Sequence, residues 1–325
     1  MLQQLNRQLE KCMPLITPIS VVLGILLTHE FKSFLFLVPW IFAFMTFTGS
    51  LSSNFKHLKE VITHPFPVLV ALVILHILMP LWALGIGHIV FSKDSLTVTG
   101  LVLGMVIPSG ITSFIWVSIY RGQIPVALSI ILIDTLLSPL IVPYSLSFFV
   151  HEKAAIDVWP MMKDLLIMIV IPSVLGMLLN QLTNGKVKDT IGTRLAPFSK
   201  VCMGIVVMIN ASVAAPYLSH INKKLILIAF IVFIIAASGY LFCWIIGKLL
   251  RWDRGMIVTL IYSGGMRNIS AGSVIALTYF HPPVAVPVII GMLFQQVLAS
   301  FYGYMLHIVY DKKEEQYEKR LRKSS

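Results

Sequence analysis

The chain has 325 residues, of which 57% are hydrophobic and 12% are charged, and its formal net charge is +11 at pH 7. Soluble domains carry about 25% charged residues, so this composition excludes a soluble globular protein and predicts an all-α protein that crosses the membrane several times. The positive charge is more typical of a membrane-orientation signal than of nucleic-acid binding. The three cysteines are isolated, which argues against a disulfide framework or a zinc site.

Apolar runs recur along nearly the whole chain. A membrane helix needs about 20 residues to cross the hydrocarbon core. On this basis ten spans are predicted, at residues 14–29, 35–51, 66–90, 97–119, 124–150, 161–182, 196–217, 224–248, 255–280 and 284–310. They predict a single membrane domain over residues 1–310, with one five-span repeat at about 14–150 and a second at about 161–310.

The fourth and ninth spans are interrupted by glycine, proline and polar residues. GMVIPSGITSFIW begins at Gly104, and SGGMRNISAG begins at Ser263. After a short turn, each interruption is followed by a helix that opens Pro-Val-Ala, at 125–127 and 283–285. Because each half holds five spans, the second half is predicted to have inverted topology. Paired breaks of this kind are the best sequence indication of a transporter's central site.

Basic residues are distributed unevenly between the two sides of the ten predicted spans. The side with both termini holds 18 of the 25 Lys and Arg residues, the opposite loops hold six, and Arg267 lies within a span. Cytoplasmic loops are enriched in Lys and Arg. We therefore predict a cell-membrane protein with both termini in the cytoplasm, where residues 311–325 form a charged tail.

Unwound helix leaves backbone groups without partners at membrane depth. Such N–H groups favour anions and such carbonyls hold cations. Ser109, Thr112 and Ser113 flank the first break and are candidates for substrate or ion contacts. The alternative is that these hydroxyls only satisfy the broken backbone.

Several motifs together make the chain resemble the bile acid:sodium symporter family over nearly its whole length. They are Met79-Pro80, PSG at 108–110, GQIPVALSIILIDTLLSPLIVP at 122–143, GMRN at 265–268 and PPVAVP at 282–287. The resemblance implies a six-helix core packed against a four-helix panel, with discontinuous helices four and nine crossing each other. It also implies sodium-coupled transport of an organic anion, and no cofactor apart from sodium as the coupling ion.

The chain departs from that family where the family places its sodium ligands. Ser113 and Asn268 keep the expected side chains, but other ligand positions fall on Leu75, Phe114, Ala127, Ile131, Ser263 and Arg267. What remains for sodium is Ser113, Ser263 and the backbone of Gly264 and Met266. A sodium ion takes about five or six oxygens, by analogy with harder cations. We therefore expect weak or absent sodium dependence.

Two formal charges, Asp134 and Arg267, lie deep in apolar spans. A buried arginine costs roughly 2.5–3.5 kcal/mol even on lenient insertion scales. Our hypothesis is that Arg267 takes the place and charge of a sodium ion, with Asp134 as its counter-ion. Two alternatives stay open: the pair only locks two helices, or the carboxylate carries a proton and makes transport proton-coupled.

Three further polar residues are weaker candidates. His76, beside Met79-Pro80, is either a packing histidine or a proton shuttle. Asn210 and Gln295 lie mid-helix, where they either face the substrate cavity or pack in the core.

These features predict a secondary transporter for a small, monocarboxylate-like organic anion, working by alternating access in the lipid bilayer. Sodium coupling is what the resemblance implies, and the alternative is a proton-coupled or uncoupled transporter that uses Asp134 and Arg267. An intramembrane aspartyl protease needs two aspartates, and only Asp134 lies at depth. The rhomboid G-x-S-G motif and HExxH are missing as well, so an enzyme is disfavoured.

Overall fold

The computed structural model describes residues 2–53, 55, 65–149, 157–218 and 221–311, and within them the regular elements are all helices. The predicted charged tail lies outside these residues except for Asp311. The membrane-spanning part of the all-α prediction therefore agrees with the structure.

Ten helical elements are described in the first half of the chain. They are α1 (Leu2–Leu26), α2 (Thr28–Phe31), η1 (Lys32–Leu37), α3 (Val38–Ser50), α5 (Pro65–Val73), η2 (Ile74–Leu78), α6 (Met79–Val90), α7 (Ser95–Val106) and α8 (Ser113–Ile119), and α9 (Ile124–Phe149) then closes this half. η2 is a turn of π-helix that ends directly before Met79-Pro80. A proline cannot donate the usual helical hydrogen bond, so the helix widens by one residue there instead of breaking.

The second half begins after the undescribed residues 150–156. Its elements are α10 (Val158–Leu165), η3 (Leu166–Val170), α11 (Ile171–Leu182), η4 (Lys188–Gly192), α12 (Thr193–Leu218), α13 (Lys223–Leu249), α14 (Arg254–Gly265), α15 (Ile269–Tyr279), η5 (Pro282–Val284), α16 (Ala285–Leu306) and η6 (His307–Asp311). Short polar side chains start several of these helices: Asn222 Oδ1 accepts from Leu225 N at 2.8 Å, and Asp253 Oδ1 from Met256 N at 3.1 Å. Such caps satisfy N–H groups that a helix leaves open at its first turn.

Seven helices among the described residues are long and apolar enough to cross a membrane. They coincide with seven of the ten predicted spans. The predicted first, fourth and ninth spans hold shorter apolar helices, at Leu15–Leu26, Ser95–Val106 and Ile269–Tyr279. The count of ten and the inverted repeat therefore stay predictions.

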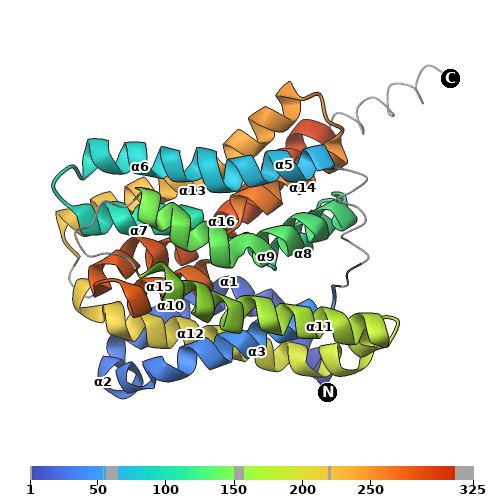
Figure 1. Cartoon of the computed structure of the whole chain (residues 1–325), viewed down its shortest axis with the longest axis horizontal. Helices are drawn as coiled ribbons and strands as arrows, with labels where there is room; N and C mark the ends of the chain where they lie inside the picture. The colour runs from blue at the N-terminus through green and yellow to red at the C-terminus, as the bar shows by residue number, and fades with distance from the viewer. Residues whose placement is uncertain (1, 54, 56–64, 150–156, 219–220, 312–325) are drawn as a thin grey trace.

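The helices form two groups (Figure 1). In one group α1 and α3 pack on α12, and α11 packs on α3. In the other, α13 packs on α14 and α16, while α7 packs on α6 and α16. The contacts of α12 with α15 and α16 join the groups, and both chain breaks lie in the second group beside this junction.

Candidate functional site

Both predicted breaks are present, and they meet. Helix ends at Val106 and resumes at Ser113, and it ends again at Gly265 and resumes at Ile269. The two unwound segments pair antiparallel through a bridge between Ser109 and Arg267. The amide of Asn268 donates to Pro108 O at 2.8 Å, and that of Gly110 to Met266 O at 3.1 Å. Each break thus supplies partners that the other lost, as a membrane interior requires.

Small residues make this close crossing feasible. A Cβ atom on Gly110 would lie 2.9 Å from Arg267 O, and one on Gly265 would lie 2.6 Å from the ring of Tyr240. The Ser109 hydroxyl adds a further link by donating to Ser263 O at 2.8 Å. Asn268 caps α15, since its Oδ1 accepts from Ala271 N at 3.4 Å. The crossing is therefore fixed by backbone and side-chain bonds together.

Asp134 anchors the first break from α9. Its side chain is completely buried, and its Oδ2 accepts from the amide of Ser109 at 2.6 Å. Its Oδ1 lies 2.6 Å from Nε2 of His76, which is 7% exposed. The carboxylate therefore links η2, α9 and the break between α7 and α8 into one hydrogen-bonded unit.

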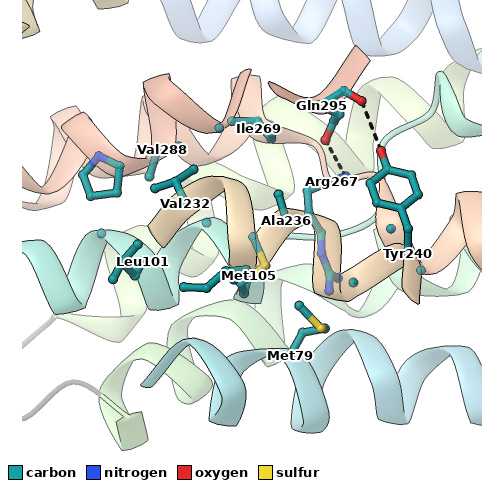
Figure 2. A pocket seen from close by; sticks show the side chains of 18 residues that line it. Met79, Leu101, Met105, Val232, Ala236, Tyr240, Arg267, Ile269, Val288 and Gln295 are labelled. Carbon is teal, nitrogen blue, oxygen red and sulfur yellow. Dashed lines mark hydrogen bonds between the residues drawn. The ribbon is translucent and has the colours of Figure 1, made fainter. Parts of the chain in front are cut away.

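Arg267 is also buried, at 2% exposure. Its amide donates to Gln295 Oε1 at 2.9 Å, while its guanidinium points away from Gln295 and toward Met79 (Figure 2). There it lines an internal space of about 30 Å³, enclosed mostly by apolar side chains and glycines. Neither Nη1 nor Nη2 has a hydrogen-bond partner. The arginine is thus a fixed cation inside the core, behind the crossing.

We expected Asp134 to be the direct counter-ion of Arg267, and the structure does not form that ion pair. Both carboxylate oxygens of Asp134 are already bonded, to His76 and to the amide of Ser109. The carboxylate still interacts with the guanidinium electrostatically. Asp134 therefore balances the charge of Arg267 across space, without contact.

A larger cavity, of about 450 Å³, separates the two helix groups at the crossing. Its described lining comes from α1, α3 and the residues directly after it, α8, η4, α12, α15, α16 and the two breaks. One face of α12 contributes to it, at Thr193, Ala196, Ser199, Lys200, Met203 and Val207, and α3 contributes Phe42, Met45, Thr46, Thr48 and Gly49. Spacings of three and four residues bring such side chains to one side of a helix.

The predicted site residues divide between the cavity and the core. Thr112, Asn268, Gln295 and Arg267 line the cavity. Buried behind the lining are the side chains or backbones of Ser109, Ser113, Asp134, His76, Ser263, Gly264 and Met266. Asn210 does not line the cavity either, because its Nδ2 donates to Ser273 Oγ at 2.6 Å and joins α12 to α15.

The polar cavity residues that the sequence analysis missed lie mostly on α3 and α12. Thr46, Thr193, Ser199 and Lys200 all line the cavity. Their hydroxyl and ammonium groups recur at helical spacing within apolar segments, which is the signal for a wet helix face. That signal does not say whether the wet face borders a cavity or the membrane surface.

Few of the side chains that were predicted to bind sodium are suited to do so. The hydroxyls of Ser113 and Ser263 are buried without a hydrogen-bond partner, so both oxygens are unused. In the part of the chain that the structure describes, however, no group of three or more His, Cys, Asp or Glu side chains is placed to hold a metal ion. The nearby guanidinium of Arg267 adds a positive charge that repels a cation.

Comparison with known proteins identifies the family. The family model described as the Sodium Bile acid symporter family matches residues 39–221. The chain belongs to the sodium bile acid symporter family. With its several long apolar helices, this makes it a multi-pass membrane protein of a transporter family.

Three individual proteins are similar to this chain over most of its length. The "Uncharacterized protein YbaS" of Bacillus subtilis (strain 168) is 54% identical over 295 residues, which are 91% of this chain and 96% of that protein. The "Uncharacterized sodium-dependent transporter YocS" of the same organism is 24% identical over 288 residues, 86% of this chain and 87% of that protein. The "Probable sodium/metabolite cotransporter BASS1, chloroplastic" of Oryza sativa subsp. japonica is 25% identical over 250 residues, 77% of this chain and 59% of that protein.

Proposed function

We propose that this symporter-family chain moves a small amphipathic organic anion, of the monocarboxylate class, by alternating access. The observation that carries the proposal is the charge of the 450 Å³ cavity: its described lining includes Lys188 and Lys200, and no Asp or Glu. Arg267 also contributes to the lining, and its guanidinium lies in the smaller 30 Å³ space. The volume of the larger cavity lies within the usual range of small-molecule sites. A cavity with basic but no acidic lining favours an anion.

The position of the lining residues suggests how such an anion would be held. Asn268, Ile269 and Ser270 line the cavity at the N-terminus of α15, where backbone N–H groups carry partial positive charge. Phe42 and Met45 of α3 and Phe114 of α8 offer apolar surface in the same lining. A carboxylate at α15 with its apolar body toward α3 uses both features.

The direction in which the cavity extends supports a proposal for the conformational state of the transporter. It extends from the crossing to Ser52 beyond α3 and to Lys188 in η4. These ends belong to the side with the basic excess, which we predict to be cytoplasmic. The structure then represents an inward-facing state, and rocking of α1, α3, α11 and α12 against the other helices would open the opposite side.

Coupling to sodium is suggested by the printed names of YocS and BASS1. For this chain we propose that the guanidinium of Arg267 supplies the positive charge that a sodium ion gives its relatives. A covalently fixed cation needs no sodium to stay in place, so transport would depend weakly on sodium.

Thermal melting of the purified protein tests the substrate class. Phenylpyruvate, pyruvate and lactate would each be compared with the neutral amide, with and without sodium. We expect acids to raise Tm and amides to have no effect. We also expect Lys188→Gln with Lys200→Gln to weaken the shift, while Lys186→Gln, an exposed lysine outside the cavity lining, preserves it. Equal shifts by acids and amides would refute the proposal.

A further inference from the structure

His76 and Asp134 are 58 residues apart in the sequence and meet in the core through one short hydrogen bond, with Nε2 and Oδ1 2.6 Å apart. Neither residue lines the cavity. A buried imidazole and a buried carboxylate in contact form a group that can gain or lose one proton. The other ring nitrogen, Nδ1 of His76, has no partner and remains open to a proton.

The pair is connected to the substrate cavity by a short chain of bonds. Oδ2 of Asp134 accepts from the amide of Ser109, and Ser109 forms the bridge with Arg267 at the crossing. The next residue, Gly110, lines the cavity and donates its amide to Met266 O. A change of charge on the pair therefore acts on the cavity wall through the backbone of the break.

The charged surroundings of the pair are simple. η2 and α9 pack against α5, α6, α7, α8, α10, α14 and η3. On the described residues, the other buried ionisable side chains of the core are Arg267, Tyr240, Cys243, Tyr262 and Tyr302, so none is a second acid. The remaining ionisable groups on the packed elements and at their caps are partly or fully exposed: His88, Asp94, Tyr120, Tyr144, Asp157, Lys163, Asp164, Asp253 and Arg254. Arg267 is thus the buried fixed charge with which Asp134 interacts electrostatically.

We propose that the His76–Asp134 pair is the proton-binding site that couples anion transport to a proton gradient, an inference that rests on the proposed function. With neutral His76, the charges of Asp134 and Arg267 cancel. One proton taken up on His76 gives an imidazolium bonded to the carboxylate and a core charge of +1. A bound monocarboxylate cancels that charge. Proton and anion therefore enter from one side together and leave on the other, and the cycle moves no net charge.

Uptake into proteoliposomes tests the coupling. The probe is phenylpyruvate, or the acid from the melting panel that stabilises the protein most. For one proton per anion, a gradient of one pH unit supports about tenfold accumulation. We expect this accumulation in sodium-free medium with the acidic side outside, and no effect of a potassium diffusion potential.

Two variants distinguish loss of the proton-binding pair from a general loss of folding or activity. His76→Gln should lose accumulation driven by the pH gradient and keep exchange of labelled for unlabelled anion, because the cavity is intact. His88→Gln, at an exposed histidine of α6, should behave as the wild type. Accumulation that follows sodium, or that His76→Gln leaves at the wild-type level, would overturn the proposal.

A spectroscopic arm works without transport. ¹⁵N NMR signals of the His76 ring, assigned by their loss in His76→Gln, should change from neutral to protonated over the pH range in which uptake rises. If no panel anion moves under any gradient, the proposed function fails, and the NMR titration alone still decides whether His76 binds the proton. A ring that stays in one protonation state from acid to alkaline pH refutes the site.

Discussion

Replacing Asp134 with Asn tests whether the buried acid balances Arg267. The carboxylate accepts two short hydrogen bonds and is the acidic group that acts on the guanidinium. Removing one partner of a buried charge pair typically costs about 3–5 kcal/mol, since the other charge stays behind uncompensated. Asn keeps one acceptor oxygen and can still receive the Ser109 amide. We therefore expect Asp134→Asn to lower the free energy of unfolding by about 3–5 kcal/mol.

The second step removes the stranded cation. Nη1 and Nη2 of Arg267 make no hydrogen bond that a shorter side chain would break, and the amide of Arg267 keeps its bond to Gln295. Adding Arg267→Gln to Asp134→Asn should therefore recover part of the loss, by about 1–3 kcal/mol, the range of coupling between interacting residues. The remaining deficit belongs to the His76 bond, which neither replacement restores.

Stability of the four proteins in detergent, followed by denaturant titration, gives the coupling energy of the cycle. Asp164→Asn is the matched control, because Asp164 of α10 accepts from the hydroxyl of Tyr279 in α15 and is not among the groups that act on the Arg267 guanidinium. It should show no coupling to Arg267→Gln. Additive losses for Asp134→Asn and Arg267→Gln would refute the idea that the two charges balance across space.

Three other outcomes follow from the same geometry. Wild-type uptake should be similar in choline and sodium media, whereas Arg267→Gln should either abolish uptake or make it depend on sodium; steep sodium dependence of the wild type would contradict this. A C-terminal fluorescent reporter should light up and an exported-enzyme reporter should stay inactive, as cytoplasmic termini require; the reverse pattern would overturn the orientation. Gly110→Ala should abolish uptake, since its Cβ would lie 2.9 Å from Arg267 O, while Gly104→Ala, whose Cβ meets nothing within 4 Å, should keep it; equal uptake by both would show that the crossing tolerates separation.

The breaks could be predicted from the sequence because their cause is local. Glycine and proline in the fourth and ninth spans interrupt helices wherever those spans lie, so the breaks at Ser109 and Arg267 follow from composition and spacing. That the two breaks cross each other was implied by the family resemblance. Asp134 and Arg267 could be recognised as membrane-embedded charges from the apolar residues next to them in the sequence.

The partners of those charges could not be predicted, because they depend on packing between distant segments. Asp134 and His76 are 58 residues apart, and only the fold brings Nε2 to the carboxylate. The expected direct contact with Arg267 overlooked a competitor that sequence patterns do not display, the backbone amide of Ser109. The cavity faces of α3 and α12 were missed because an apolar segment looks alike whether it borders lipid or a cavity.

A fixed cation has a consequence for energetics. A coupling ion drives transport because it dissociates on the far side, and the guanidinium of Arg267 cannot dissociate from its chain. If it occupies the role of a sodium ion, the free energy of a sodium gradient is lost at that position, and only another mobile ion or the gradient of the anion itself can replace it. Among the described residues, the buried imidazole and the buried carboxyl group next to the crossing are those of His76 and Asp134. The two proposals therefore support each other: replacement of an ion by Arg267 would remove a driving force, and a proton on the His76–Asp134 pair would supply one through the hydrogen bond to Ser109.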